Sequence, residues 1–223
     1  AVDAGKAVTR IKCGTGGMGG GMGGGMGCPG GGSSPYRWTA YRNLGLTDTE
    51  LQGLAVFNDP SRANCSSCHS LEPGSDGYPL FTDYGYDNLG IPKNLDNPYY
   101  AMPEAWNPDG GNWIDLGLGG FLKEAGYPAE VYEPEMGKVK VPTLRNVDLR
   151  PVEGFVKAYG HNGFFKSLED VVFFYHWRAM MDSGMGCGMD GGMGDGCEGI
   201  MDMFAAPEVD QNRAQLNMFP RMQ

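Results

Sequence analysis

The sequence is poor in positive charge and has no long apolar run. Its 223 residues include 17 lysines and arginines against 27 aspartates and glutamates, which gives a formal net charge of −10. Nucleic acids and anionic membrane surfaces repel such a chain, so neither is expected as a partner. A membrane-spanning helix needs a run of about 18 or more apolar residues, and none occurs. We therefore expect no membrane span, and docking to a positively charged protein.

Histidine is also scarce, and one of the three histidines completes a motif. Cys65, Cys68 and His69 form a C-x-x-C-H sequence, the attachment signature of c-type haem. Both cysteines would form thioethers with the porphyrin, and His69 would be the proximal iron ligand. A redox dithiol or half a zinc site is the alternative, but the only other histidines are His161 and His176. The motif occurs once, so we expect one covalent haem c.

Glycine is concentrated in two low-complexity tracts, residues 14–32 and 183–199. Glycine at this density buries too little surface to form a helix or strand, so both tracts are expected on the surface. Four cysteines lie in or beside the tracts, and an even number in an oxidising compartment predicts two disulfides. Three pairings are possible, and spacing favours Cys13 with Cys28 and Cys187 with Cys197.

Methionine recurs every four residues in the same regions. The positions are Met18, Met22 and Met26, then Met181, Met185, Met189 and Met193. Thioether sulfur suits Cu(I), so copper binding is one hypothesis. The favoured alternative is that these adaptable side chains pack on a partner surface.

Composition divides the chain into an N-terminal segment (1–34), a haem domain (35–182) and a segment with the C-terminal tail (183–223). The apolar residues of the tail, Phe204 among them, are expected to dock back onto the domain. The first residues, Ala-Val-Asp-Ala-Gly, are typical of a chain after signal removal. Haem attachment also needs a compartment outside the cytoplasm, so a periplasmic or extracellular location is predicted.

Two helices can be predicted inside the haem domain. Thr47 and Glu50 form a capping box that predicts a helix to about Asn58, leading into the C-x-x-C-H motif. Ser167 and Asp170 form a second box. Residues 70–140 are rich in proline, glycine and asparagine and predict ordered loops with short helical turns.

The second iron ligand could be Tyr175, His176, His161, a methionine or water. Tyr175 continues the helical stripe of Leu168, Val171 and Val172, which is expected to face the core. His176 is rotated by about 100° from this stripe. Helical geometry therefore favours Tyr175, although an ordinary core aromatic fits the pattern equally well.

Several short motifs occur in order along residues 35–180. They are Gly53–Phe57, Pro79–Asp83, Tyr86–Gly90, Lys140–Val147, His161–Gly163 and Ser167–Val172. Together with C-x-x-C-H they resemble the C-terminal haem domain of the bacterial dihaem cytochrome c peroxidases. This family includes the dihaem enzyme that matures the tryptophan-derived quinone of methylamine dehydrogenase. No counterpart of the family's N-terminal haem domain is found.

The resemblance implies a mostly α-helical, class I cytochrome c-like domain with long loops. It places the distal iron ligand fourteen residues after His161, at Tyr175, with His176 as the fallback. Arg145 is a possible partner for a haem propionate. The family binds calcium between its two domains, so a calcium site is also possible, although no counterpart of the second domain is found. His161 would be the family's motif histidine, expected as a buried imidazole bonded to backbone.

The function predicted from the sequence is electron transfer by a monohaem cytochrome. Its partner would be a redox protein, either another haem protein or copies of itself. The alternative is a peroxidase or oxidase that uses hydrogen peroxide at the same iron, which requires an open or displaceable sixth position. A copper-handling protein with a haem module is a weaker alternative.

Overall fold

The computed structural model describes residues 45–60, 62–72, 78–149, 152, 155, 158–182 and 204–215. The chain divides into two compact units. Unit 1 comprises residues 1–84, 141–147 and 218–223, and unit 2 comprises residues 85–140 and 148–217. Regular structure in the described residues is mostly helical, as predicted. The four cysteines outside the haem motif, and every tract methionine except Met181, lie outside the described residues.

Among the described residues of unit 1, the first helix is α2 (Asp48–Asn58), which has the predicted bounds. The Glu50 amide donates to the Thr47 hydroxyl at 3.2 Å, and the Glu50 carboxylate accepts from the Thr47 amide at 2.7 Å. This reciprocal capping box satisfies two amides that a helix start otherwise leaves unbonded. Leu51 anchors the helix, because its side chain is fully buried. The 3-10 turn η2 (Cys65–Ser67) follows.

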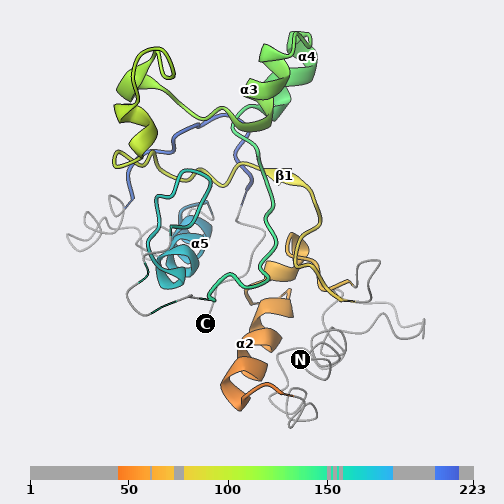
Figure 1. Cartoon of the computed structure of the whole chain (residues 1–223). Coiled ribbons are helices and arrows are strands. Elements are labelled where there is room, and N and C mark those ends of the chain that lie inside the picture. Colours follow the sequence, from red (N-terminus) through yellow and green to blue (C-terminus); the bar gives the residue numbers. More distant parts are fainter. Residues whose placement is uncertain are drawn as a thin grey trace, which may run out of the picture. The chain divides into compact units, whose positions relative to one another are not determined.

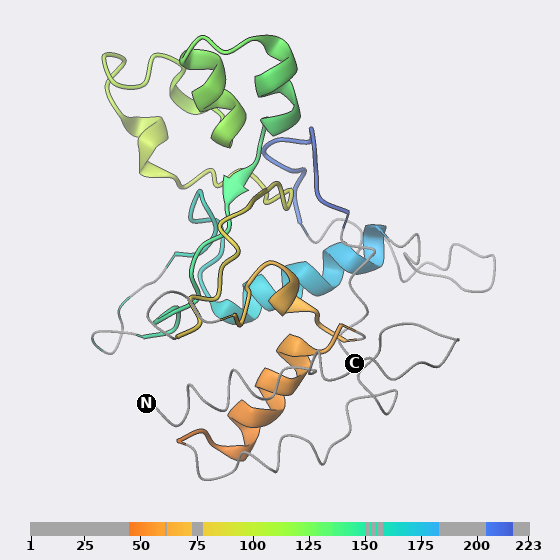
Figure 2. The same ribbon diagram turned by 90° about the vertical axis from the view of Figure 1, so that its right-hand side faces the viewer.

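Unit 2 contains a short two-stranded ladder that closes a long excursion of the chain. Strand β1 (Tyr86–Asp87) pairs antiparallel with β2 (Val139–Lys140). The excursion holds two α-helices and three 3-10 turns, and α3 and α4 lie side by side in Figures 1 and 2. In chain order these elements are η3 (Pro98–Ala101), η4 (Gly110–Asn112), α3 (Gly117–Glu124), α4 (Ala129–Tyr132) and η5 (Glu133–Glu135).

Helix α5 (Leu168–Asp182) begins where the sequence predicts, since the Asp170 amide donates to the Ser167 hydroxyl at 3.0 Å. The predicted stripe is only partly correct, because Val171 packs against the aromatic core and Val172 does not. Phe174 and Arg178 are buried, whereas Val172 is 52% exposed. The core lies against Phe174, so the face that carries Val172 is turned away from it.

The core of unit 2 is a small aromatic cluster completed by the C-terminal segment. Ile91, Phe165 and Phe174 are buried together, and Phe204 packs edge-on against Phe174 with ring centroids 5.2 Å apart. Residues 204–215 lie beside residues 88–92, and the Ala214 amide donates to the Asn88 carbonyl at 2.8 Å. The expected docking of Phe204 is therefore confirmed.

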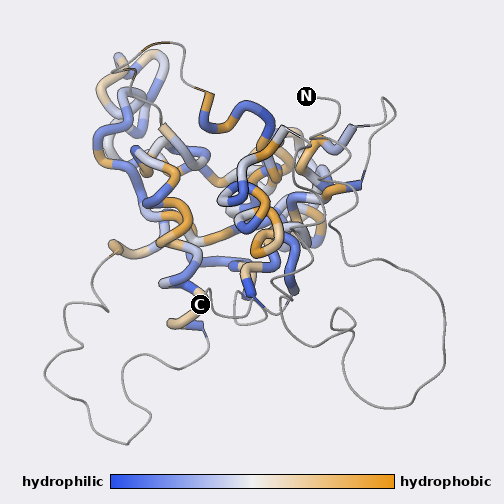
Figure 3. The backbone as a smooth tube through the Cα atoms, turned by 90° about the horizontal axis from the view of Figure 1, so that it is seen from below, coloured by the Kyte–Doolittle hydropathy of each residue, from blue (hydrophilic) through white to orange (hydrophobic). Residues whose placement is uncertain are grey.

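Hydrophobic and hydrophilic residues alternate in short stretches along the described backbone (Figure 3). No helix among the described residues is long and apolar enough to cross a bilayer.

Two helical glycines should respond in opposite ways to alanine. A Cβ on Gly119 would overlap the backbone of Met136, whereas one on Gly53 would meet no atom within 4 Å. We expect Gly119→Ala to lower the free energy of unfolding by about 2 kcal/mol or more through overpacking. Gly53→Ala should raise it by about 0.5–1 kcal/mol, because alanine favours the helix. Denaturant titration followed by circular dichroism measures both, and equal effects would contradict the packing of α3.

Candidate haem-binding site

The C-x-x-C-H motif lies on a single turn of unit 1. Asn64 precedes η2 in the left-handed conformation, with φ of 50°. The His69 amide then donates to the Cys65 carbonyl at 2.9 Å, which continues the helical turn through Cys68. Residues at helical spacings of three and four share one face. The turn therefore presents Cys65, Cys68 and His69 to the same side, as covalent haem attachment requires.

The imidazole of His69 is oriented by a backbone carbonyl twelve residues further along the chain. Its Nδ1 lies 2.9 Å from the Phe81 oxygen. A carbonyl can only accept, so Nδ1 carries the proton and Nε2 keeps its lone pair. Metal-binding histidines use this arrangement to fix the tautomer and the ring orientation. His69 is therefore prepared to bind a metal through Nε2.

The loop that supplies this carbonyl is held by a buried threonine. The Thr82 hydroxyl donates to the Val141 carbonyl at 2.7 Å and accepts from the Tyr84 amide at 3.0 Å. Phe81 has φ of 55°, and its ring packs edge-on against Phe57 of α2 at a centroid distance of 6.2 Å. A non-glycine residue keeps this backbone conformation only when its surroundings hold it there.

The two cysteines of the motif suit thioether attachment better than thiolate chemistry. Burial raises the pKa of the Cys65 thiol to about 11. A thiol with a raised pKa is a poor nucleophile and a poor zinc ligand, because both roles require the thiolate. Within the described ranges, no three histidine, cysteine or acidic side chains gather as they would around a metal ion. The donor set therefore fits a c-type haem, with His69 as the iron ligand.

The other predicted haem ligands lie in different places. Arg145 shares unit 1 with the motif, where its guanidinium lies 5.7 Å from the centre of the exposed Tyr78 ring. Tyr175 and His176 lie on α5 in unit 2, and both are half-buried. In the described structure, Nδ1 of His176 is buried without a hydrogen-bond partner. The pairing of His69 with Tyr175 stays a prediction, as does the propionate role of Arg145.

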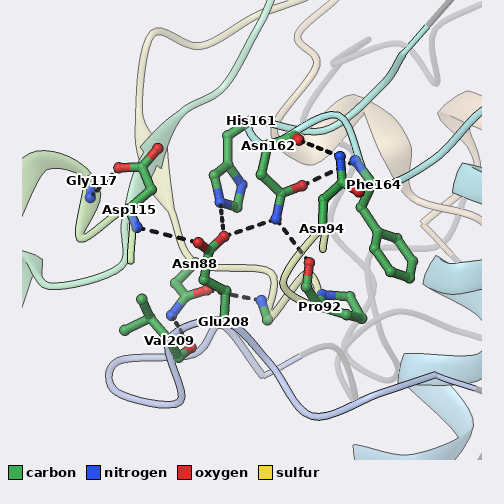
Figure 4. Close-up of polar contacts among 11 residues, drawn as sticks. Asn88, Pro92, Asn94, Asp115, Gly117, His161, Asn162, Phe164, Glu208 and Val209 are labelled. Atoms are coloured by element: carbon green, nitrogen blue, oxygen red, sulfur yellow. Dashed lines mark hydrogen bonds and ion pairs between the residues drawn. The ribbon is translucent and has the colours of Figure 1, made fainter. Parts of the chain in front are cut away.

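His161 has a partner that the sequence did not reveal. Its Nε2 lies 3.0 Å from a carboxylate oxygen of Glu208, whose side chain is only 2% exposed (Figure 4). The expected bond from this imidazole to backbone is therefore wrong. Glu208 comes from the C-terminal segment, beyond a glycine-rich tract, and no spacing rule connects it to His161. A buried charge is costly unless it is paired, so this contact is a strong constraint on the segment.

Asparagine side chains complete the network around Glu208. Asn162 Nδ2 donates to the Glu208 carboxylate and to the Pro92 carbonyl, each at 2.8 Å. The Asp115 amide donates to the other carboxylate oxygen at 3.2 Å. Burial raises the pKa of Glu208, but these hydrogen bonds and that of His161 outweigh burial, so the pKa lies below its usual value. Figure 4 shows these groups converging on one carboxylate.

The hydroxyl of Thr82 should be essential to the loop that orients His69. Thr82→Val keeps the side-chain shape but removes the hydroxyl's bonds to the Val141 carbonyl and the Tyr84 amide. We expect a loss of about 1–3 kcal/mol in the free energy of unfolding, while Thr82→Ser, which keeps the hydroxyl, should lose less than about 1 kcal/mol. Denaturant titration of the haem-loaded protein measures both. Equal losses in the two variants would show that the hydroxyl bonds are unimportant.

Loss of the Glu208 carboxylate should destabilise unit 2 and change its acid response. Glu208→Ala removes the bonds from His161 Nε2, Asn162 Nδ2 and the Asp115 amide, and we expect a cost of about 2–4 kcal/mol. Because the folded pKa is lowered, the carboxylate's contribution is full above the unfolded glutamate pKa and is lost as the pH falls through the folded value. Glu208→Gln should therefore unfold with a shallower pH dependence in acid than the wild type. Identical acid titration curves would contradict the network.

No protein-family model matches the chain, but individual proteins do. It is 27% identical over 144 residues to the cytochrome-c peroxidase IdrP1 of Denitromonas iodatirespirans, covering 63% of this chain and 34% of the relative. The methylamine utilization protein MauG of Methylophilus methylotrophus is 26% identical, with 69% and 34% covered. MauG of Paracoccus denitrificans is 33% identical, with 59% and 29% covered.

A solved structure also matches part of the chain. The diheme peroxidase BthA from Burkholderia thailandensis is 31% identical, with a TM-score of 0.44, and the match covers 60% of this chain and 28% of that one. The chain spans about a third of the length of the curated relatives it matches. Over about three fifths to two thirds of its own length, the chain is therefore a relative of the dihaem cytochrome c peroxidase family.

Proposed function

We propose that this chain is a monohaem c-type cytochrome that transfers electrons. The observation that carries the proposal is the hydrogen bond from His69 Nδ1 to the Phe81 carbonyl, within a C-x-x-C-H turn. This bond leaves Nε2 for iron, and the half-buried Cys65 fits a thioether. When bound, the haem supplies a one-electron Fe(III)/Fe(II) couple. The residues of the chain anchor it, orient the proximal ligand and set its potential.

In this proposal the chain carries one haem. The chain has one C-x-x-C-H sequence and spans about a third of the relatives' length. The proposed counterpart is the C-terminal haem domain of the family, with a class I cytochrome c-like fold. A domain of this kind would exchange electrons with a redox partner protein in the periplasm or outside the cell.

Tyr175 is the proposed distal ligand, and two observations support it. It lies fourteen residues after His161, the family's spacing for this ligand. Its ring is also half-buried and packs edge-on against Phe174, with ring centroids 6.4 Å apart, so the surrounding structure holds its side chain in place. A phenolate would stabilise Fe(III) and lower the potential relative to a methionine ligand. His176 is the fallback, supported by its buried Nδ1.

The proposal also covers a propionate partner, Arg145, and two metal ions, calcium and copper. Arg145 would pair with a propionate through its planar guanidinium. Calcium would need an acidic cluster, and the described residues include none. Copper would bind the methionine tracts, which lie largely outside the described residues.

A peroxide-using enzyme is the second candidate, because four relatives are named cytochrome-c peroxidase. It would need an iron position that hydrogen peroxide can reach. A tyrosine ligand that stays bound would exclude this chemistry, so the identity of the sixth ligand separates the two functions.

The absorption and magnetic-resonance spectra of the ferric protein test the proposal. We expect one covalent haem by mass, a six-coordinate spectrum that hydrogen peroxide does not change, and a tyrosinate charge-transfer band. Tyr175→Phe should abolish the band and raise the reduction potential, while Tyr159→Phe in the same unit should leave both unchanged. A five-coordinate, high-spin spectrum with rapid reaction toward peroxide would favour the enzyme instead. A protein without attached porphyrin would exclude both functions.

A further inference from the structure

The connection between β1 and β2 exposes an unusual number of apolar side chains. Fifteen large hydrophobic side chains are exposed among the described residues, and seven of them fall within residues 95–135. Trp106 is 71% exposed and Phe121 is 65% exposed. Scattered apolar residues are normal on a surface, but a concentration of them marks an interaction site. The seven are Leu95, Met102, Trp106, Ile114, Phe121, Tyr127 and Val131.

The exposed charges of the same segment are almost all negative. Lys123 is the one exposed basic residue within residues 95–135. The same segment has six exposed acidic residues: Asp96, Glu104, Asp109, Glu124, Glu130 and Glu133. Glu135 is half-buried and is paired with Lys138 at 3.2 Å, so it adds little to the field. The segment therefore presents apolar groups within a negative potential.

The α3–α4 hairpin, residues 117–135, is a part of this segment that packing and hydrogen bonds hold in a defined structure. The two helices pack side by side in both views (Figures 1 and 2). The Tyr127 amide closes the connection by donating to the Leu122 carbonyl at 3.0 Å, beside Gly126 with φ of 82°. Gly119 allows α3 to approach the backbone at Met136. A surface that is already ordered loses little entropy when it binds.

Apolar and acidic side chains lie together on this hairpin. Phe121, Tyr127 and Val131 are 65%, 50% and 40% exposed. Glu124 follows Phe121 by three residues, one turn along the same side of α3. Glu130 and Glu133 flank Val131 along the chain. Protein interfaces combine an apolar, aromatic-rich centre with a polar or charged rim.

We propose that the α3–α4 hairpin is the docking surface for a basic redox protein, one that presents lysines around an apolar contact patch. The inference rests on the proposed electron-transfer function, because it names the class of partner for that function. The carboxylates would steer a positively charged partner, and the exposed aromatic residues would provide the contact energy. A second copy of this chain would bring a like-charged hairpin, and an anionic membrane or a nucleic acid would be repelled.

The test uses the full-length, haem-loaded protein and, as the probe, a small lysine-rich c-type cytochrome of high isoelectric point. Binding is measured by titration at low and high salt. One variant combines Phe121→Ser with Tyr127→Ser, and a second combines Glu124→Gln, Glu130→Gln and Glu133→Gln. Matched controls are Leu149→Ser, which changes a residue that is 68% exposed, and Glu169→Gln, an exposed carboxylate elsewhere in unit 2.

Each hairpin variant should weaken binding by about tenfold or more, and the controls should stay within about twofold. The charge variant should also lose most of the salt dependence, because screening acts on the carboxylates it lacks. Equal affinities in wild type and hairpin variants, or no binding by the wild type, would overturn the proposal. So would a wild-type dimer that the Phe121→Ser and Tyr127→Ser changes dissociate, since the occupant would then be a second copy.

Electron exchange with the probe is followed in the same samples to separate the two proposals. Binding that depends on the hairpin without electron transfer would support docking and contradict the electron-transfer function. Rapid electron transfer that is unaffected by the hairpin variants would support the function and overturn the docking surface. The haem spectrum and circular dichroism of each variant should match the wild type.

Discussion

The hydrogen bond between His69 Nδ1 and the Phe81 carbonyl is the constraint on which the proposed haem site depends. It determines which imidazole nitrogen carries the proton and therefore which one can bind iron. The carbonyl points correctly only because Phe81 adopts a left-handed backbone conformation, and the Thr82 hydroxyl holds the following turn. The orientation of the imidazole thus depends on the backbone of Phe81 and on the hydroxyl of the next residue, Thr82.

A second constraint lies in unit 2, where the Glu208 carboxylate is buried among hydrogen-bond donors. The cost of removing a charge from water is offset here by His161, Asn162 and the Asp115 amide. His161 and Asn162 are neighbours in the sequence and Asp115 lies in another segment, so the carboxylate joins both segments to the C-terminal tail. The His161–Gly163 motif, which resembles a motif of the peroxidase family, therefore connects its own segment to the C-terminal tail through Glu208, whatever further role His161 has.

Local signals in the sequence predicted local structure well. The capping boxes at Thr47 and Ser167 place the starts of α2 and α5 correctly, because a cap is decided by residues three apart. The C-x-x-C-H motif could be recognised for the same reason, because its residues lie within five positions of one another. The mostly helical character and the relation to dihaem peroxidases also followed from motifs in order along the chain.

The features that depend on distant contacts were not predictable from the sequence. Glu208 lies 47 residues from His161, and nothing in its surroundings in the sequence identifies it as buried. The buried face of α5 was misplaced around Val172, because the position of the aromatic core depends on Phe204, which arrives from the tail. Periodicity shows that a helix has an apolar stripe, but only tertiary packing decides which of two adjacent stripes is covered.

The attachment of the C-terminal segment to unit 2 has a consequence for the integrity of the polypeptide. Arg178 donates to Asp182 at the end of α5 and lies 3.5 Å from the Ala214 carbonyl, while Phe204 is inserted in the aromatic core. Both ends of residues 183–203 are therefore held by the same folded body. A protease that cut the chain between them would produce two fragments that remain associated, and the tail would be released only on unfolding.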